Sequence, residues 1–247
     1  MLNQKRNINW NYGGESWKLS RSKIEFFLDC PRCFYTDNKY GIRRPSMPSF
    51  LLNNAVDQQL KNEFDKYRIE GKKHPIQEEN NIDAIPAKHE NIDIWRENFE
   101  GVEYFHEKTK MLICGAIDDL WINEKDEYIV VDYKATAKSE PVTELNPEWS
   151  GSYKRQIEMY QWLLRKNNLK VSDIGYFVYC TGILDQEFFD KKIEFDIKLI
   201  EYIGDDSWIE DVIFEIKNCL DSDVLPNSGK DCEHCNWLKM RGEVEGE

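Results

Sequence analysis

The chain has 247 residues, 40% of them hydrophobic, and carries a formal net charge of -13 at pH 7. A chain of this length can bury one substantial core, so one large domain is expected rather than two equal ones. The acidic balance argues against a protein that coats nucleic acid, because phosphate binding relies on Lys and Arg, so any contact with nucleic acid should be local. No apolar run reaches about 18 residues, and "MLNQKRNINWNYGG" lacks the apolar region of a signal peptide. We therefore expect a cytoplasmic protein with no membrane partner.

Two helices are expected near the N-terminus. Ser20 is a suitable N-cap for a helix over 21–30, which places Cys30 at its C-terminal end. A second, amphipathic helix is predicted over 49–68. Its apolar residues recur four positions apart: Leu52, Val56, Leu60 and Phe64. The polar segment 69–98 shows little pattern and is predicted to be a loop.

The pattern then changes to that of strands. "VEYFHEKTKMLICGAIDDLWINEKDEYIVVDYKAT", starting at residue 102, predicts three strands separated by "KTK" and "NEKDE", and so a β-meander. Helical spacing returns over 150–168, a short buried strand follows over 174–180, and a last helix is expected over 205–221. The segment "LPNSGKDCEHCNWLKM" reads as a turn-rich tail. The fold class is therefore α/β.

The stretch "VVDYKAT" puts Asp132 and Lys134 on the same face of a strand, about 6.5–7 Å apart along it. Asp118 ends the preceding predicted strand, so hairpin pairing would bring its carboxylate beside Asp132. Two carboxylates that close are unfavourable unless a cation lies between them, and Mg²⁺ or Mn²⁺ takes oxygen ligands. The lysine could then orient a metal-bound water and stabilise charge on a phosphoryl group. The alternative is an exposed acid–lysine pair, worth at most about 1 kcal/mol and chemically idle.

Three short motifs stand in a fixed order along the chain: "GAID", then "DYK", then "QIEMY" on the following helix. This order resembles the PD-(D/E)XK nuclease superfamily, and specifically its RecB-like branch. The resemblance covers roughly residues 19–238, although only the short motifs carry it. It implies a restriction-endonuclease-like fold, in which a mixed sheet is flanked by helices.

The resemblance also implies roles for the residues in these motifs. Asp118 and Asp132 would be ligands of Mg²⁺ or Mn²⁺, and Lys134 would be the catalytic lysine. Gln156 and Tyr160 would hold the lysine or the backbone of the substrate. All five are therefore candidate catalytic residues.

The family usually has a histidine metal ligand on the helix before the sheet, where this chain has Asp57 in "NNAVDQQLKNEF". An aspartate is a good oxygen ligand for Mg²⁺, so Asp57 is the predicted third ligand. Glu63 is a second candidate. The two positions lie about 600° apart around a helix, so they cannot both face one metal. Alternatively, each is a solvated acid on the polar face.

The pairs "CPRC" and "CEHC" stand about 200 residues apart in the chain. Reducing compartments keep thiols free, so metal binding is the better explanation than a disulfide framework. If the two ends of the fold meet, the pairs make one four-thiolate site. Its ligands would be Cys30, Cys33, Cys232 and Cys235. The weaker alternative is a pair of dithiol redox centres; the other three cysteines lie in apolar runs and are expected in the core.

The RecB-like branch includes CRISPR-adaptation exonucleases and the AddAB-type helicase-nuclease subunit, in which terminal cysteines hold a [4Fe-4S] cluster. Their usual pattern has one cysteine before the core and three after it. This chain has two and two, with Arg241 where a third late cysteine is expected. The resemblance favours a [4Fe-4S] cluster, and Zn²⁺ is the alternative because four thiolates suit both.

Together these features predict one nuclease-like domain over 1–247, with a core over about 49–200 and a cysteine clasp from about 19–45 and 222–241. The expected function is a metal-dependent DNase, exonuclease-like on single-stranded DNA ends, in DNA repair or defence. A helicase or another protein is the expected partner. The alternative is a catalytically inactive, cluster-bearing adaptor that binds nucleic acid or protein on the nuclease scaffold.

Overall fold

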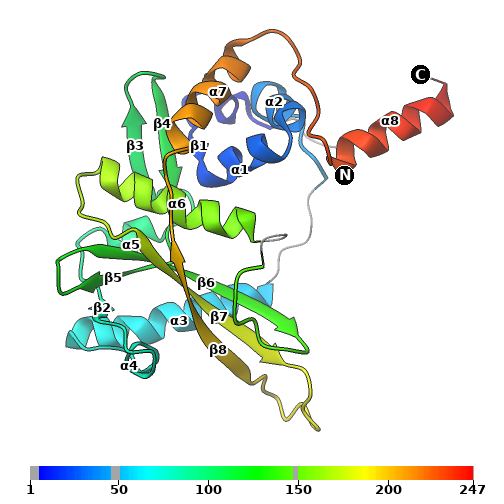
Figure 1. Ribbon diagram of the computed structural model, residues 1–247. Helices are drawn as coiled ribbons and strands as arrows, with labels where there is room; N and C mark the ends of the chain where they lie inside the picture. Colours follow the sequence, from blue (N-terminus) through cyan, green and yellow to red (C-terminus); the bar gives the residue numbers. More distant parts are fainter. Residues whose placement is uncertain (1–5, 46–50, 147–149, 247) are drawn as a thin grey trace. The chain divides into compact units, whose positions relative to one another are not determined.

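The computed structural model describes residues 6–45, 51–146 and 150–246. The chain forms two compact units, each assembled from segments that are distant in the sequence (Figure 1). Unit 1 takes its described residues from 1–48, 105–114 and 207–247, and unit 2 from 49–104 and 115–206. That the whole chain behaves as one domain stays a prediction.

Unit 2 is built around a mixed sheet that has five strands among the described residues, in the order β2-β5-β6-β7-β8. The strands are β2 (Ala84–Pro86), β5 (Asp119–Asn123), β6 (Tyr128–Lys138), β7 (Ile174–Ile183) and β8 (Phe195–Ile203). β6 and β7 are parallel, and the other neighbouring pairs are antiparallel. Asp119 pairs with Val131, so residue 118 comes to lie beside residue 132.

Two long helices, α3 (Leu51–Glu70) and α6 (Gly151–Lys166), cover opposite faces of this sheet (Figure 1). Phe64 of α3 is fully buried in a core with Trp121, Val131 and Tyr133, whose side chains point to that face of the strands. Ile157 of α6 packs closely on the other face, where Gly175 leaves room for it: a Cβ there would lie 2.7 Å from Ile157. One face of this sheet therefore packs against α3 and the other against α6.

Shorter elements complete unit 2. They are α4 (Pro75–Glu79) and α5 (Ile92–Trp95). A capping box begins α4. The ring nitrogen Nδ1 of His74 accepts a hydrogen bond from the backbone of Ile76, and the side chain of Gln77 accepts one from the backbone N–H of His74. The prediction of a plain loop over 69–98 is thus wrong, because caps and pairing with β5 organise a segment that has no clear periodicity.

Unit 1 is mainly helical. Its elements are η1 (Ile8–Trp10), α1 (Arg21–Asp29), α2 (Pro31–Tyr40), α7 (Ile209–Asp221) and α8 (Glu233–Glu245), with β1 (Leu19–Ser20), the end of β3 (Val102–His106) and all of β4 (Met111–Gly115) except Gly115, which belongs to unit 2. These strands form a smaller sheet in the order β1-β4-β3, in which β1 runs parallel to β4. The fold is therefore the mixed α/β class that the sequence predicted.

Several predicted elements are confirmed. The hydroxyl of Ser20 accepts a hydrogen bond from the backbone of Lys23 and caps α1, which ends just before Cys30. The helices predicted over 49–68 and 150–168 are α3 and α6; the first two residues of the former lie outside the described residues. The strand predicted over 174–180 is β7, which continues to Ile183. The helix predicted over 205–221 is confirmed as α7, although it begins at Ile209.

Other predictions are wrong. The β-meander is absent from the described structure, because the chain turns at residues 116–118 and sends β4 and β5 into different sheets. β8 was not predicted, although "FDIKL" alternates as an edge strand does. The tail is turn-rich only up to Cys232, and α8 begins at Glu233. α8 buries none of its side chains, so no apolar period marks it in the sequence.

Within the parts of the chain that are described, no helix is both long enough and apolar enough to cross a membrane.

Candidate functional site

A cavity of about 370 Å³ in unit 2 collects most of the predicted catalytic residues. Its walls come from α3, β6, α6 and the turn before β5. The predicted residues in its lining are Asp57, Asp118, Lys134 and Gln156. Asp132 lies two residues before Lys134 on β6, and Tyr160 lies one helical turn after Gln156 on α6. The fold thus brings together all six residues that the motifs pointed to.

Asp132 is completely buried and forms an ion pair with Lys134. Neither of its carboxylate oxygens accepts a hydrogen bond from a residue that the structure describes. Lys134 also donates a hydrogen bond of 3.2 Å to Oε1 of Gln156, and its ammonium lies 4.7 Å from the ring centre of Tyr153. The ion pair with Lys134 engages Oδ2 only, and Oδ1 has no partner among the described residues. Burying a carboxylate oxygen without a partner is costly, and binding of a divalent cation would offset this cost.

Asp118 faces the same cavity and keeps 22% of its side chain exposed. Its Oδ2 accepts a 2.9 Å hydrogen bond from the backbone of Tyr133, which holds it beside β6. Burial, and next the negative charge of Asp132, raise the pKa of Asp118 to about 6. The two carboxylates therefore repel each other as they stand, and together they fit the donor set of a hard divalent ion.

Asp57 reaches the cavity from α3. Its Oδ2 accepts a 2.9 Å hydrogen bond from Lys61, one helical turn further on, and the ammonium of Lys61 is 4.0 Å from Oδ1 of Asp118. Burial, and next the charge of Asp118, raise the pKa of Asp57. Glu63 instead contacts His74, at 2.9 Å. No sequence motif pointed to Lys61, whose only signal was its i,i+4 spacing from Asp57.

Gly115, the first residue of "GAID", packs against Tyr160, the last residue of "QIEMY". The side-chain amide of Gln156 donates a 3.0 Å hydrogen bond to the hydroxyl of Tyr160. The ring of Tyr160 lies so close to Gly115 that a Cβ at this position would be 2.8 Å from it. The absence of a side chain at Gly115 therefore allows the position of the Tyr160 ring. Tyr160 in turn accepts the hydrogen bond of Gln156, and Gln156 contacts Lys134.

Gly115→Ala is expected to lower the free energy of unfolding by about 1–3 kcal/mol, because the added methyl forces the ring of Tyr160 to move. Urea denaturation measures this loss. The matched control is Gly182→Ala in β7, where the nearest atom to a new Cβ is 3.5 Å away, an ordinary contact. Equal stability of the two variants would show that the contact with Tyr160 is not restrictive.

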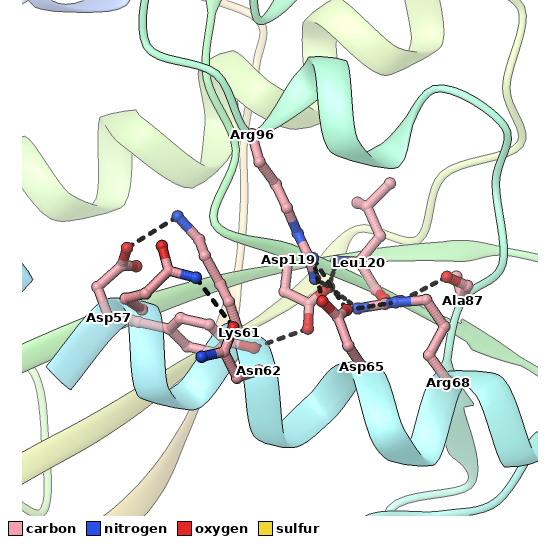
Figure 2. Close-up of polar contacts among 11 residues, drawn as sticks. Asp57, Lys61, Asn62, Asp65, Arg68, Ala87, Arg96, Asp119 and Leu120 are labelled. Carbon is pink, nitrogen blue, oxygen red and sulfur yellow. Dashed lines mark hydrogen bonds and ion pairs between the residues drawn. The ribbon is translucent and has the colours of Figure 1, made fainter. Parts of the chain in front are cut away.

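A buried ionic network supports the wall of the cavity next to Asp118 (Figure 2). Asp119 is completely buried and accepts hydrogen bonds from Arg68, from Arg96 at 2.7 Å and from the hydroxyl of Tyr133 at 2.7 Å. Both arginines also pair with Asp65. The two adjacent acids of "GAIDD" therefore have different surroundings, and the sequence alone held no signal that separates them.

The four predicted cysteines meet within unit 1. Their sulfur atoms all lie within 4.8 Å of one another, and three of the six pairs are 3.4 to 3.7 Å apart. Cys30 is the N-cap of α2 and Cys232 is the N-cap of α8. Each of these two sulfurs accepts a 3.5 Å hydrogen bond from the backbone of the cysteine three residues later, Cys33 or Cys235. Each C-x-x-C pair is thus the first turn of a helix.

Further donors surround the sulfurs. The backbone of Gly229 donates to Cys30 at 3.1 Å, and Nη2 of Arg44 donates to Cys232 at 3.0 Å. Burial raises the pKa of the Cys30 thiol, but hydrogen bonds from the N–H groups of Gly229 and Cys33 and from the thiols of Cys232 and Cys33 together lower that pKa to about 7. Burial raises the pKa of the Cys33 and Cys235 thiols. The donor set therefore suits thiolates that bind a metal. No motif had pointed to Arg44.

Of the remaining cysteines, Cys114 and Cys180 are buried as expected, whereas Cys219 is only half-buried.

The comparisons with known proteins agree with the motifs. The family model of the PD-(D/E)XK nuclease superfamily matches residues 46–240. Among solved structures, the chain is similar to the crystal structure of SSO0001, with 16% sequence identity, coverage of 90% of this chain and 84% of that chain, and a TM-score of 0.45. No curated protein matches it. Because the family model spans more than three quarters of the sequence and includes the three motifs, the chain belongs to the PD-(D/E)XK nuclease superfamily.

Proposed function

We propose that the chain is a deoxyribonuclease that uses Mg²⁺ or Mn²⁺ to hydrolyse phosphodiester bonds. The observation that carries this proposal is the state of Asp132, a fully buried carboxylate with no hydrogen bond from the described residues, beside Lys134 and Asp118. This arrangement is unfavourable for a purely structural site. It suits one that holds a cation and a phosphate.

Asp118 and Asp132 would hold the ion, with Asp57 as the predicted third ligand. When bound, the ion would lower the pKa of a water molecule and neutralise charge at the phosphate. Lys134, kept in place by Gln156, would orient the attacking water and stabilise the growing negative charge. The water oxygen bonds to phosphorus and the phosphorus–oxygen ester bond breaks. The water loses a proton to solvent and the leaving oxygen gains one, so the products are a phosphate end and a hydroxyl end.

The substrate we propose is a single-stranded DNA end, in line with the RecB-like branch. The net charge of -13 opposes a grip on long duplex, so recognition has to be local. The cavity is lined by the ring of Tyr153 and the ammonium of Lys134, groups that suit a base and a phosphate. Exonuclease action in DNA repair or defence in the cytoplasm, with a helicase or another protein as partner, is part of the same proposal.

We further propose a single Zn²⁺ at the four cysteines. A tetrahedral zinc ion with Zn–S bonds of about 2.3 Å separates its sulfurs by roughly 3.8 Å. Three of the six sulfur separations, at 3.4 to 3.7 Å, are close to this value, and all six are within 4.8 Å. A [4Fe-4S] cluster places four irons and four sulfides between its cysteines and so holds them further apart. The [4Fe-4S] cluster expected from the resemblance is kept as the alternative.

The alternative function, an inactive adaptor, is favoured by one observation: Asp57 stands where the family has a histidine and is ion-paired with Lys61. Incubation with end-labelled linear and circular single-stranded DNA in Mn²⁺ separates the two functions. We expect cleavage of the linear substrate that disappears when Mn²⁺ is omitted. A Lys134→Ala variant should be about 100-fold slower or worse, as for removal of a donor that stabilises the transition state. Cleavage by this variant at the wild-type rate would show that the activity does not come from this site. A wild type inert on both substrates favours the adaptor.

A further inference from the structure

Lys61 is a second lysine in the lining of the cavity, in addition to Lys134. Its ammonium lies 2.9 Å from Oδ2 of Asp57 and 4.0 Å from Oδ1 of Asp118. Only 15% of its side chain is exposed. Figure 2 shows Lys61 and Asp57 side by side on α3, joined by this contact. A positive charge is thus enclosed between two of the three predicted metal ligands.

The position of Lys61 matters for the number of metal ions. Sites with two divalent ions hold them about 3.5–4 Å apart, with carboxylates shared between the two ions. Asp118 is the carboxylate next to both Asp132 and Lys61: Asp132 lies beside it across the pairing of β5 with β6, and the ammonium of Lys61 is 4.0 Å away. A second ion would need the oxygens of Asp57 and Asp118 that face Lys61. A divalent ion and an ammonium repel each other and cannot share that place.

The balance of charge in the cavity leads to the same conclusion. Arg96 also lines the cavity, but it is neutralised by Asp119 and Asp65. The three predicted ligands and the two lysines then leave one negative charge. One divalent ion turns this into one positive charge, which matches the single negative charge of a phosphodiester. Two ions would leave a threefold positive site.

We propose that the ammonium of Lys61 takes the place of a second divalent ion, so that the site binds a single ion at Asp118 and Asp132. Lys61 is then a positioning residue: it holds Oδ2 of Asp57 and leaves the other oxygen of Asp57 for the ion. It also supplies the second positive charge beside the phosphate. This inference rests on the proposed nuclease function and deepens it.

The test counts bound Mn²⁺ by calorimetry and electron paramagnetic resonance, with the full chain and no DNA. Only ions that are lost in an Asp132→Asn variant are counted, because an acidic surface also binds Mn²⁺ weakly. We expect one ion in the wild type. Lys61→Ala should bind two, with the signal of a spin-coupled pair, and Lys61→Arg should bind one. Lys66→Ala, an exposed lysine on the same helix, makes the same change in net charge and should leave the count at one.

Two ions in the wild type, or one ion in a folded Lys61→Ala variant, overturn the inference. If Lys61→Ala fails to fold, the wild-type count still decides between one ion and two. A wild type that binds two ions and cleaves DNA disproves the role of Lys61 and leaves the nuclease function standing. A wild type that binds no Mn²⁺ and cleaves nothing removes both.

Discussion

Asp118→Asn is expected to slow metal-dependent cleavage severely, whereas Asp119→Asn, one residue further on, is expected to destabilise the protein and leave its response to metal intact. Asp118 lines the cavity with its carboxylate close to that of Asp132, so its loss removes a metal ligand. Asp119 is completely buried and paired with Arg68 and Arg96, so its loss leaves two guanidinium groups with Asp65 as their remaining shared carboxylate. The same Asp→Asn change thus distinguishes Asp118, a proposed metal ligand, from Asp119, which stabilises the fold.

The sizes of the two effects differ accordingly. Loss of Asp118 should slow cleavage by about 10²–10³-fold, the cost of removing one group that stabilises the charge of the transition state. Loss of Asp119 should lower the free energy of unfolding by about 3 kcal/mol, because one partner of a buried ionic network is removed. Cleavage assays measure the first effect. Melting temperatures with and without Mn²⁺ measure the loss of stability and the binding of the metal. At 100 times its Kd, Mn²⁺ should stabilise the wild type and Asp119→Asn by about 2.7 kcal/mol, and Asp118→Asn not at all.

The pH dependence of stability without metal gives a second readout. Burial and the charge of Asp132 raise the pKa of Asp118 to about 6, above its value of 3.8 in the unfolded chain. Ionisation of Asp118 is therefore opposed by the fold, and stability present below pH 4 is lost as the pH rises through 6. Asp118→Asn should lack this loss, and Asp119→Asn should retain it.

The Mn²⁺ experiment has its own contradicting outcome. If Asp118→Asn still gains stability from Mn²⁺, Asp118 is not a ligand.

Removing the metal from the four cysteines is expected to cause the largest loss of stability. The two C-x-x-C pairs join segments about 200 residues apart in the sequence, and structural zinc can supply on the order of 10 kcal/mol to folding. Cys33→Ser combined with Cys235→Ser should lower the melting temperature by more than 10 °C, because a loss of 1 kcal/mol alone costs about 2–4 °C in a chain of this size. A strong zinc chelator should do the same to the wild type.

The controls distinguish the metals and the structural role. Cys219→Ser changes a half-buried thiol outside the site and should leave the melting temperature within a few degrees of the wild type. Metal analysis of anaerobically purified protein should find one zinc per chain in a colourless sample. A brown sample that contains iron and sulfide would replace zinc by the [4Fe-4S] cluster. Unchanged melting after complete metal removal would contradict the stabilising role itself.

Much of the architecture follows from local pattern. The apolar spacing in α3 and α6, and the capping hydroxyl of Ser20, depend on residues within a turn or two of each other, so the sequence alone predicted them. The split between β4 and β5 depends on which sheet each strand joins, and α8 buries no side chain. Neither leaves a periodic signal in the sequence.

The candidate site divides in the same way. The spacing of Asp132 and Lys134 on one strand, and of Gln156 and Tyr160 on one helix, is a property of the sequence and of regular secondary structure. The convergence of the two C-x-x-C pairs was a conditional expectation that required the ends of unit 1 to meet, and they do.

The tertiary structure decided which neighbours these residues have. Only packing shows that Asp118 faces a cavity while the adjacent Asp119 is buried between two arginines. Only packing places the ring of Tyr160 against Gly115 and the ammonium of Lys61 between two acids. The physical reason is that ionic and steric contacts act over a few ångströms in space, between residues separated by up to several tens of positions, and no local period encodes such distances.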